Sequence, residues 1–148
     1  MPRIERSAQV VWEGNVARGQ GTISADTGAF SGLPYSLATR IGQAEGKTSP
    51  EELLAAAHAA CLTMSLASEL TSAGTPPGRL DAACQIVMDE VPGQGHQVVA
   101  SHVEVTAALD GVDETALREA TEKADDGCPF SSLLRRAGVD VHVSTRLA

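Results

Sequence analysis

Three cysteines, Cys61, Cys84 and Cys128, are the side chains of this 148-residue sequence that are best suited to covalent chemistry. An ionised thiol is a nucleophile that can be oxidised reversibly, whereas a buried, protonated thiol behaves as a small hydrophobic group. The spacings CxxC and HxxxH, which are typical of zinc ligands, do not occur, although His58 lies three residues before Cys61. We therefore expect no metal site, and the cysteines are either inert or redox-active.

Cys61 lies in the middle of a long expected helix. Ser49 is suited to the N-cap and Pro50 to the first helical position, and the helix is expected to run over Leu53–Thr71 and to end before Gly74. Its middle is apolar on almost all sides, which predicts a buried central helix. Cys61 lies ~15 Å from the helix start, where the helix dipole is too weak to activate a thiol. Either Cys61 is a small buried hydrophobic residue, or a nearby cation lowers its pKa.

Cys128 lies between Gly127 and Pro129, at the expected N-cap of a short helix. Backbone N–H groups at this position favour a thiolate, and a mobile junction would let the thiol reach another cysteine at the Cα separation of ~4.4–6.8 Å that a disulfide needs. A cysteine that replaces serine as the helix cap is the alternative. Cys84, in contrast, shares one face of an expected strand with apolar residues, which predicts an inert core thiol.

The rest of the sequence predicts strands and one further helix around the central helix. The first three strands, expected as an antiparallel meander, are Ala8–Trp12, Gly19–Ser24 and Tyr35–Arg40. The later elements are the strands Asp81–Glu90, Gln97–Leu109 and Val139–Thr145 and the helix Glu114–Asp126. A single α+β domain over residues 1–148 is therefore expected.

Composition narrows the class of partner. The net charge of −8 argues against nucleic acid and against anionic lipid surfaces. Residues 1–20 lack the apolar segment of a signal peptide, and the longest mainly apolar run, Leu53–Leu62, is too short to span a bilayer, so we expect a cytoplasmic protein. A core built mainly from small side chains gains from further burial in an oligomer, which favours a dimer.

Five short motifs occur in an order and at spacings that resemble the OsmC/Ohr family of organic hydroperoxide-resistance proteins. They are Trp12-Glu13-Gly14, Pro34-Tyr35 with Thr39-Arg40, Thr48–Leu53, Ala57–Cys61 and Gly127–Ser131. The last two favour the OsmC (osmotically inducible protein C) branch. Leu62 departs from the pattern, since an aromatic residue often follows the cysteine there, and this could alter the shape of the substrate pocket.

The resemblance implies an intertwined homodimer in which antiparallel sheets wrap around central long helices. It implies a peroxidase of oxidative and osmotic stress defence that acts on organic hydroperoxides, and possible action on hydrogen peroxide, without a cofactor. Carried over to this sequence, Cys61 is the peroxidatic thiol, Cys128 the resolving thiol, Arg40 the activating cation and Glu51 its carboxylate partner. An external dithiol or a lipoyl-bearing protein would be the reductant.

The guanidinium of Arg40 suits this role because it is always charged and can also bind peroxide oxygens. Without the resemblance, Arg40 would be interpreted as a solvated arginine at a strand end, and Glu51 as an acid that stabilises the helix start. Glu51 and Cys61 lie about 80° apart around their helix and ~15 Å apart along it. One arginine cannot easily touch both, so we expect a composite site in which Arg40 and Glu51 of one chain face Cys61 and Cys128 of the other.

Other residues are assigned weaker roles. His58 is interpreted as a histidine packed at a dimer interface, with a base for the thiol as the alternative. An apolar rim for an alkyl hydroperoxide is expected from Leu53, Ala57, Met64 and Phe130. A non-catalytic module that binds an apolar ligand is the alternative function, and a structural stress protein is a third.

Overall fold

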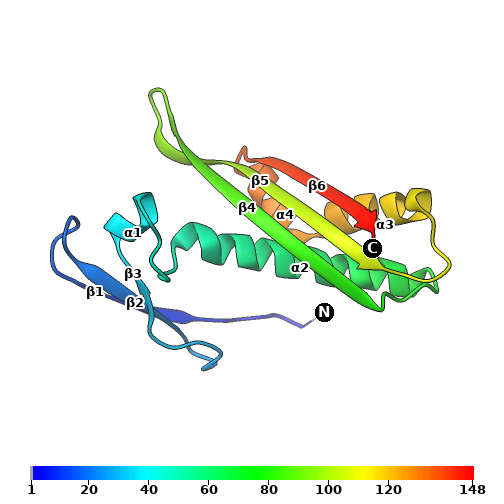
Figure 1. The fold of residues 1–148 in the computed structure, drawn as a ribbon, viewed down its shortest axis with the longest axis horizontal. Coiled ribbons are helices and arrows are strands. Elements are labelled where there is room, and N and C mark those ends of the chain that lie inside the picture. Colours follow the sequence, from blue (N-terminus) through cyan, green and yellow to red (C-terminus); the bar gives the residue numbers. More distant parts are fainter. Residues whose placement is uncertain (1) are drawn as a thin grey trace. The chain divides into compact units, whose positions relative to one another are not determined.

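The structure is a computed structural model that describes residues 2–148 of the chain. The chain divides into two compact units, one that ends at Pro50 and one that comprises Glu51–Ala148 (Figure 1). Each unit is therefore described by itself. The expectation of a single domain over residues 1–148 stays a prediction.

The N-terminal unit is an antiparallel meander with one short helix. Its strands, in the order β1-β2-β3, are β1 (Ala8–Glu13), β2 (Gln20–Ala25) and β3 (Leu33–Tyr35). The register places Gly21 of β2 opposite both Trp12 and Tyr35, whose rings lie 5.5 Å apart between centroids. A Cβ atom on Gly21 would overlap the Tyr35 ring, so any larger residue there would require the ring to shift.

The predicted third strand, Tyr35–Arg40, is wrong beyond its first residue. The strand ends at Tyr35, and Leu37–Ile41 form the short helix α1. Ser36 is its N-cap: the side-chain oxygen accepts a hydrogen bond of 3.2 Å from the backbone N–H of Thr39. This local bond satisfies a backbone donor that a strand would have left to a neighbour, and it explains why the chain turns here.

The long helix α2 (Pro50–Ser72) confirms the predicted helix and begins at the predicted proline. Its buried residues are spaced four apart: His58, Leu62, Leu66 and Leu70. This stripe packs against Val103 and Val105 of β5 (Gly95–Ala108) and against Ala124 and Cys128. Another stripe of four-residue spacing, formed by Ala56, Ala60, Met64 and Ser68, is exposed in the single chain, so the helix is buried along one face only and not all round.

The C-terminal unit carries a second sheet in the order β4-β5-β6, with β4 (Arg79–Val91), β5 and β6 (Asp140–Leu147). β4 and β5 form an antiparallel hairpin, but β6 pairs with β5 in parallel. The expectation of antiparallel sheets is therefore wrong for this strand. The helices α3 (Glu114–Gly127) and α4 (Pro129–Arg136) connect β5 to β6 and lie against β6, and a helical crossover of this kind returns the chain in the same direction (Figure 1).

Within residues 2–148, α2 is the one helix whose length and composition would suffice to cross a membrane, with a mean hydropathy of 1.4 over 18 residues. The core helix of a water-soluble protein meets the same criterion. The expectation that this apolar segment is too short to span a bilayer is therefore wrong, because the helix continues beyond Leu62 through Ser72. Its hydropathy reflects the apolar residues of the exposed stripe as well as those of the buried one.

Candidate active site

Cys61 and Cys128 meet at the point where α2 passes the junction of α3 and α4. Cys61 is half-buried on α2, and Cys128 is fully buried in the core cluster beside Leu62 and Leu66. The Cys128 side chain and the backbone N–H of Phe130 both act on the Cys61 thiol. The fold therefore brings together the two thiols that the sequence analysis selected.

The surroundings of Cys61 within this unit hold its thiol in the protonated form. Burial raises the pKa of Cys61 most, and a hydrogen bond with the Cys128 side chain raises it further, while the backbone N–H of Phe130 lowers it. The balance lies above the usual thiol value. The expectation that the helix dipole does not activate Cys61 stays a prediction.

Cys128 is the N-cap of α4, as predicted, and its side chain is buried. Its thiol makes no capping hydrogen bond, and its exposed fraction is 0%. The residue packs in the apolar core cluster, and its sulfur does not bond to the backbone N–H groups at the start of α4, of which that of Phe130 acts on Cys61 instead. A cysteine that serves as a substitute serine cap is therefore excluded.

His58 lies one turn before Cys61 and is bonded through both ring nitrogens. Nδ1 lies 2.7 Å from Oγ of Ser101 on β5, and Nε2 lies 2.9 Å from Oγ of Ser131 on α4. All three side chains are fully buried within this one chain. The expectation of a packed histidine is confirmed, but its packing partners belong to its own chain and not to a dimer interface.

The charge state of His58 follows from this burial. Burial lowers the pKa of His58 most; the carboxylate of Asp125 raises it, and Arg135 lowers it. The pKa lies below the ordinary histidine value, so the imidazole is neutral at pH 7. Sequence reasoning missed both serine partners, although Ser131 lies within the Gly127–Ser131 motif.

Cys84 joins the same group of side chains from β4. Its sulfur lies 3.5 Å from Oγ of Ser101, and the residue is half-buried against the core. Burial raises the pKa of the Cys84 thiol, and the Ser101 hydroxyl lowers it by a smaller amount. A protonated thiol on the inner face of a strand agrees with the prediction that Cys84 is unreactive.

Arg40 and Glu51 lie in different units, and their predicted roles remain predictions. Arg40 is on α1, where it lines an apolar pocket of about 190 Å³ together with Trp12, Val16, Tyr35 and Leu37. No motif in the sequence indicates this pocket, because its walls come from β1, β3, α1 and the first residue of α2. Glu51 lies in the first turn of α2 and is half-buried.

The predicted apolar rim is only partly assembled in the single chain. Leu53, Ala57 and Phe130 are half-buried, and Phe130 packs against the core cluster beside Cys61. Met64 is 68% exposed and belongs to the exposed stripe of α2. In the part of the chain that the structure describes, no group of three His, Cys, Asp or Glu side chains could hold a metal ion.

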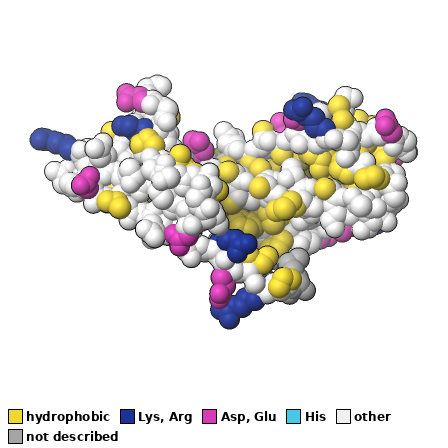
Figure 2. Space-filling view, turned by 90° about the horizontal axis from the view of Figure 1, so that it is seen from below, with side chains coloured by type: hydrophobic (Ala, Val, Ile, Leu, Met, Phe, Trp, Pro, Cys, Tyr) yellow, Lys and Arg dark blue, Asp and Glu magenta, His cyan; other side chains and the backbone are white. Residues whose placement is uncertain are grey.

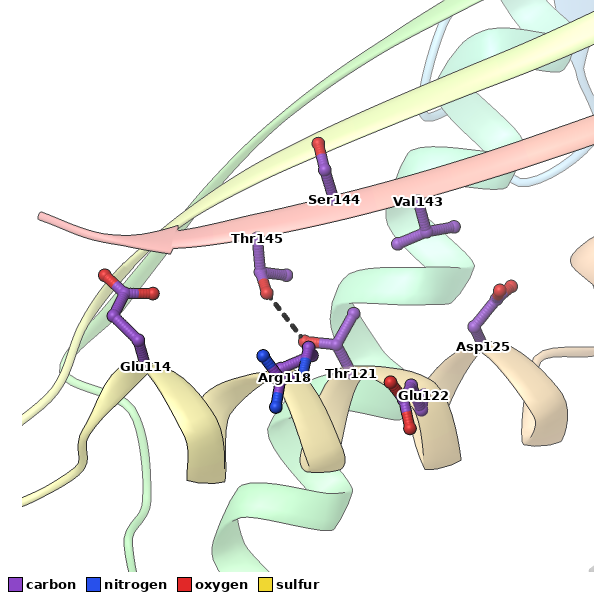
Figure 3. Close-up of a pocket in the computed structure, with 8 residues that line it drawn as sticks. All are labelled: Glu114, Arg118, Thr121, Glu122, Asp125, Val143, Ser144 and Thr145. Atoms are coloured by element: carbon purple, nitrogen blue, oxygen red, sulfur yellow. Dashed lines mark hydrogen bonds between the residues drawn. The ribbon is translucent and has the colours of Figure 1, made fainter.

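A pocket of about 390 Å³ between α3 and β6 carries no thiol. Glu114, Arg118, Glu122 and Asp125 of α3 line one side and β6 lines the other, and Oγ1 of Thr121 and Thr145 share a hydrogen bond of 2.9 Å across it (Figure 3). Charged carboxylates and an arginine do not suit an apolar hydroperoxide. The pair of cysteines, and not this pocket, is the centre of the candidate site.

The chain is similar in sequence to proteins of a known family. Residues 42–144 match the family of OsmC-like proteins. The chain is 36% identical to peroxiredoxin OsmC of Escherichia coli (strain K12) over 132 residues, which are 89% of this chain and 91% of that protein. It is 31% identical to an organic hydroperoxide resistance protein of Xanthomonas axonopodis pv. citri over 103 residues, 68% of this chain and 69% of that protein.

Solved structures share the fold. An OsmC-like protein from Mycoplasma pneumoniae superposes with a TM-score of 0.77 at 14% identity, and the match covers 98% of each chain. At this identity the likeness concerns the fold alone: α+β, with two sheets and a long helix. The matches in sequence also assign the family: the chain belongs to the OsmC-like protein family.

Proposed function

We propose that this protein is a thiol-dependent peroxidase that reduces organic hydroperoxides, and also hydrogen peroxide, in oxidative and osmotic stress defence. The observation that carries the proposal is the meeting of Cys61 and Cys128 where α2 passes the start of α4. The names of its relatives, a peroxiredoxin and an organic hydroperoxide resistance protein, support the same reaction.

The reaction needs no group beyond the two thiols and an external reductant. The Cys61 thiolate attacks one peroxide oxygen, the O–O bond breaks, and the alkoxide leaves as an alcohol after it takes up a proton. Cys61 is then a sulfenic acid. The Cys128 sulfur attacks the Cys61 sulfur, the hydroxyl leaves as water, and a Cys61–Cys128 disulfide forms. An external dithiol or a lipoyl-bearing protein returns both thiols.

Attack requires a thiolate, and the neighbours of Cys61 in its own unit raise its pKa on balance. An activating cation must therefore come from a group other than these neighbours. We propose Arg40, with Glu51 as its carboxylate partner, because a guanidinium stays charged and can stabilise both the thiolate and the leaving oxygen. Glu51 and Cys61 are too far apart on one helix for a single arginine, so Arg40 and Glu51 of one subunit would serve Cys61 and Cys128 of the other.

A homodimer is supported by the surface of small and apolar side chains that the single chain leaves exposed. Ala56, Ala60, Met64 and Ser68 form the exposed stripe of α2, and hydrophobic side chains gather on this part of the surface (Figure 2). Alanine and serine along such a stripe allow a second helix to approach closely. We propose that two α2 helices pack against each other at the centre of an intertwined dimer.

The substrate class is supported by apolar surface near both parts of the proposed site. The pocket beside Arg40 is lined by Trp12, Val16 and Tyr35, which suit an alkyl or aryl group and not a charged one. On the other unit, Leu53, Ala57, Met64 and Phe130 would complete the rim. Working thiols require a reducing compartment, so we propose a cytoplasmic location.

The first test is consumption of cumene hydroperoxide by the purified protein with dithiothreitol. Cys61→Ser should abolish turnover, at least a thousandfold, and Cys84→Ser should stay within about threefold of wild type, because only the former removes the nucleophile. A wild-type protein that is as inert as Cys61→Ser over a panel of hydroperoxides and reductants would overturn the peroxidase. Saturable binding of the hydroperoxide without turnover would then favour a binding module for apolar ligands.

The composite site has its own test. Chains with Arg40→Ala and chains with Cys61→Ser are co-expressed with different affinity tags, and the heterodimer is purified through both. One of its two sites then combines an intact Arg40 with an intact Cys61, so about half of wild-type activity should return. Heterodimers as inactive as either parent would contradict the sharing of Arg40 between subunits.

A further inference from the structure

The helices α2 and α4 are linked at a second point, one helical turn from the two cysteines. His58 precedes Cys61 by three residues on α2, and Ser131 follows Cys128 by three residues along the start of α4. The Nε2 atom of His58 and Oγ of Ser131 lie 2.9 Å apart. The pair Cys61 and Cys128 and the pair His58 and Ser131 therefore form two parallel rungs between the same helices.

The second rung is anchored to the sheet. Nδ1 of His58 is bonded to Ser101 of β5 at 2.7 Å, so the imidazole connects β5, α2 and α4 through a single side chain. Among residues 2–148, the buried side-chain nitrogen or oxygen without a partner is Oδ1 of Asp125, so His58 and both serines are satisfied. Loss of either hydroxyl would leave a buried ring nitrogen without a partner, which costs free energy. The side chains of His58, Ser101 and Ser131 therefore strongly favour this one geometry.

These hydrogen bonds also prevent His58 from acting as a base for the Cys61 thiol. A neutral imidazole has one N–H donor and one acceptor nitrogen, and here each is already used by a serine. Burial keeps the pKa of this ring low, so it does not carry a second proton at pH 7. No lone pair remains to take the proton of Cys61, which excludes His58 as the base of the thiol in this arrangement.

We propose that His58 is a positioning residue for disulfide closure: by holding Ser131, it keeps the first turn of α4, and with it the Cys128 sulfur, against Cys61. The inference rests on the proposed function, since closure is its second step. In that step the Cys128 sulfur bonds to the Cys61 sulfur, the S–O bond of the sulfenic acid breaks, and the hydroxyl leaves as water with the Cys128 proton. A fixed approach raises the rate of closure relative to the attack of a second peroxide on Cys61.

The test uses two variants of equal shape at the second rung, Ser131→Thr and Ser131→Val. Threonine adds a methyl group to the buried site and keeps the hydroxyl that His58 binds, whereas valine adds the same methyl group and replaces the hydroxyl with a second one. After addition of cumene hydroperoxide, rapid quenching with a sulfenic acid trap and mass spectrometry give two rates, for formation of the Cys61 sulfenic acid and for its closure to the disulfide. Ser132→Val, the same kind of change on the neighbouring residue of α4, is the control.

Sulfenic acid should form within about twofold of the same rate in both Ser131 variants. Closure should be at least tenfold slower in Ser131→Val than in Ser131→Thr, with more Cys61 driven to sulfinic acid, and Ser132→Val should close like wild type. Equal closure in the two Ser131 variants would overturn the proposal. So would a Ser131→Val protein in which formation slows as much as closure, because the hydroxyl would then act on the whole site. If the added methyl group prevents folding, Ser131→Ala against wild type gives the same comparison.

A second readout does not depend on peroxidase activity. The equilibrium between the dithiol and the Cys61–Cys128 disulfide is measured in glutathione redox buffers. The disulfide should be at least tenfold less favoured in Ser131→Val than in Ser131→Thr, a shift of about 30 mV in reduction potential. If the wild-type protein reduces no hydroperoxide but the two Ser131 variants still differ in reduction potential, the proposed function fails while the positioning role stands. Equal potentials would overturn the positioning role whatever the peroxidase activity.

Discussion

At the scale of single residues, the reactivity of Cys61 depends on neighbours that act in opposite directions. Burial and the Cys128 side chain raise its pKa, and the Phe130 backbone N–H lowers it. The thiol that would resolve the sulfenic acid therefore also suppresses the nucleophile before it reacts. A cation such as Arg40 has to outweigh both effects for the enzyme to work at neutral pH.

This balance predicts a pH effect for Cys128→Ala. Removal of Cys128 removes an interaction that raises the pKa of Cys61, so the pH midpoint for alkylation of Cys61 by iodoacetamide should move downward. The rate is followed by mass spectrometry of the peptide that contains Cys61, in separate reactions over a range of pH.

Cys84→Ala serves as the control, because Cys84 does not contribute to the pKa of Cys61. Its alkylation profile at Cys61 should coincide with that of wild type. A midpoint that stays in place or moves upward in Cys128→Ala would show that Cys128 does not raise the pKa of Cys61.

At the scale of elements, the N-terminal sheet positions Arg40 through the contact between the rings of Trp12 and Tyr35, which lies beside Gly21. The rings of Trp12 and Tyr35 meet beside Gly21, and both rings line the pocket that Arg40 shares. The Ser36 cap then starts α1 directly after Tyr35. The position of Arg40 thus depends on two local features, a glycine in β2 and a serine cap.

Gly21→Ala should disturb this arrangement. Its Cβ would overlap the Tyr35 ring, so we expect a loss of ~1–3 kcal/mol in the free energy of unfolding and a change in the emission of Trp12, the single tryptophan. Urea denaturation followed by tryptophan fluorescence measures both.

Gly78→Ala is the matched control, since a Cβ there would make only an ordinary contact of 3.5 Å with the carbonyl oxygen of Ala108. Its emission spectrum should equal that of wild type. An unchanged spectrum and stability in Gly21→Ala would mean that Tyr35 does not lie over Gly21.

At the scale of the whole molecule, the proposed dimer would connect assembly with activity through the exposed stripe of α2. Burial of its alanine and methionine side chains against a second helix is more favourable than their exposure to water. The proposed composite site exists only in the dimer. Oligomeric state and peroxidase activity should therefore be lost together.

Met64→Glu tests this connection, because a carboxylate at a closed apolar interface would be buried without a partner. We expect a shift of at least a hundredfold in the dimer dissociation constant by sedimentation velocity, with a parallel loss of turnover at low protein concentration. Ala116→Glu, the same charge on an exposed site of α3, should leave both unchanged. A Met64→Glu protein that stays dimeric and active would place the interface elsewhere.

The sequence by itself determined the features that depend on near neighbours. Pro50 after Ser49, the apolar run of α2 and Cys128 before Pro129 are local signals, so the long helix and the cap of α4 could be predicted residue by residue. The cysteines were recognisable as candidates for the same reason, since thiol chemistry belongs to the residue type. The strand expected over Tyr35–Arg40 failed because the capping bond of Ser36 outweighs strand propensity.

Only the tertiary structure decided which of these residues meet. His58 binds serines that lie 43 and 73 residues away in sequence, and no periodicity marks such partners. The parallel pairing of β6 and the burial of Cys128 likewise follow from how α3 and α4 connect β5 to β6 and lie against β6. Hydrogen bonds and packing between distant segments form only when the chain is folded, and so the two rungs between α2 and α4 could not be derived from the sequence.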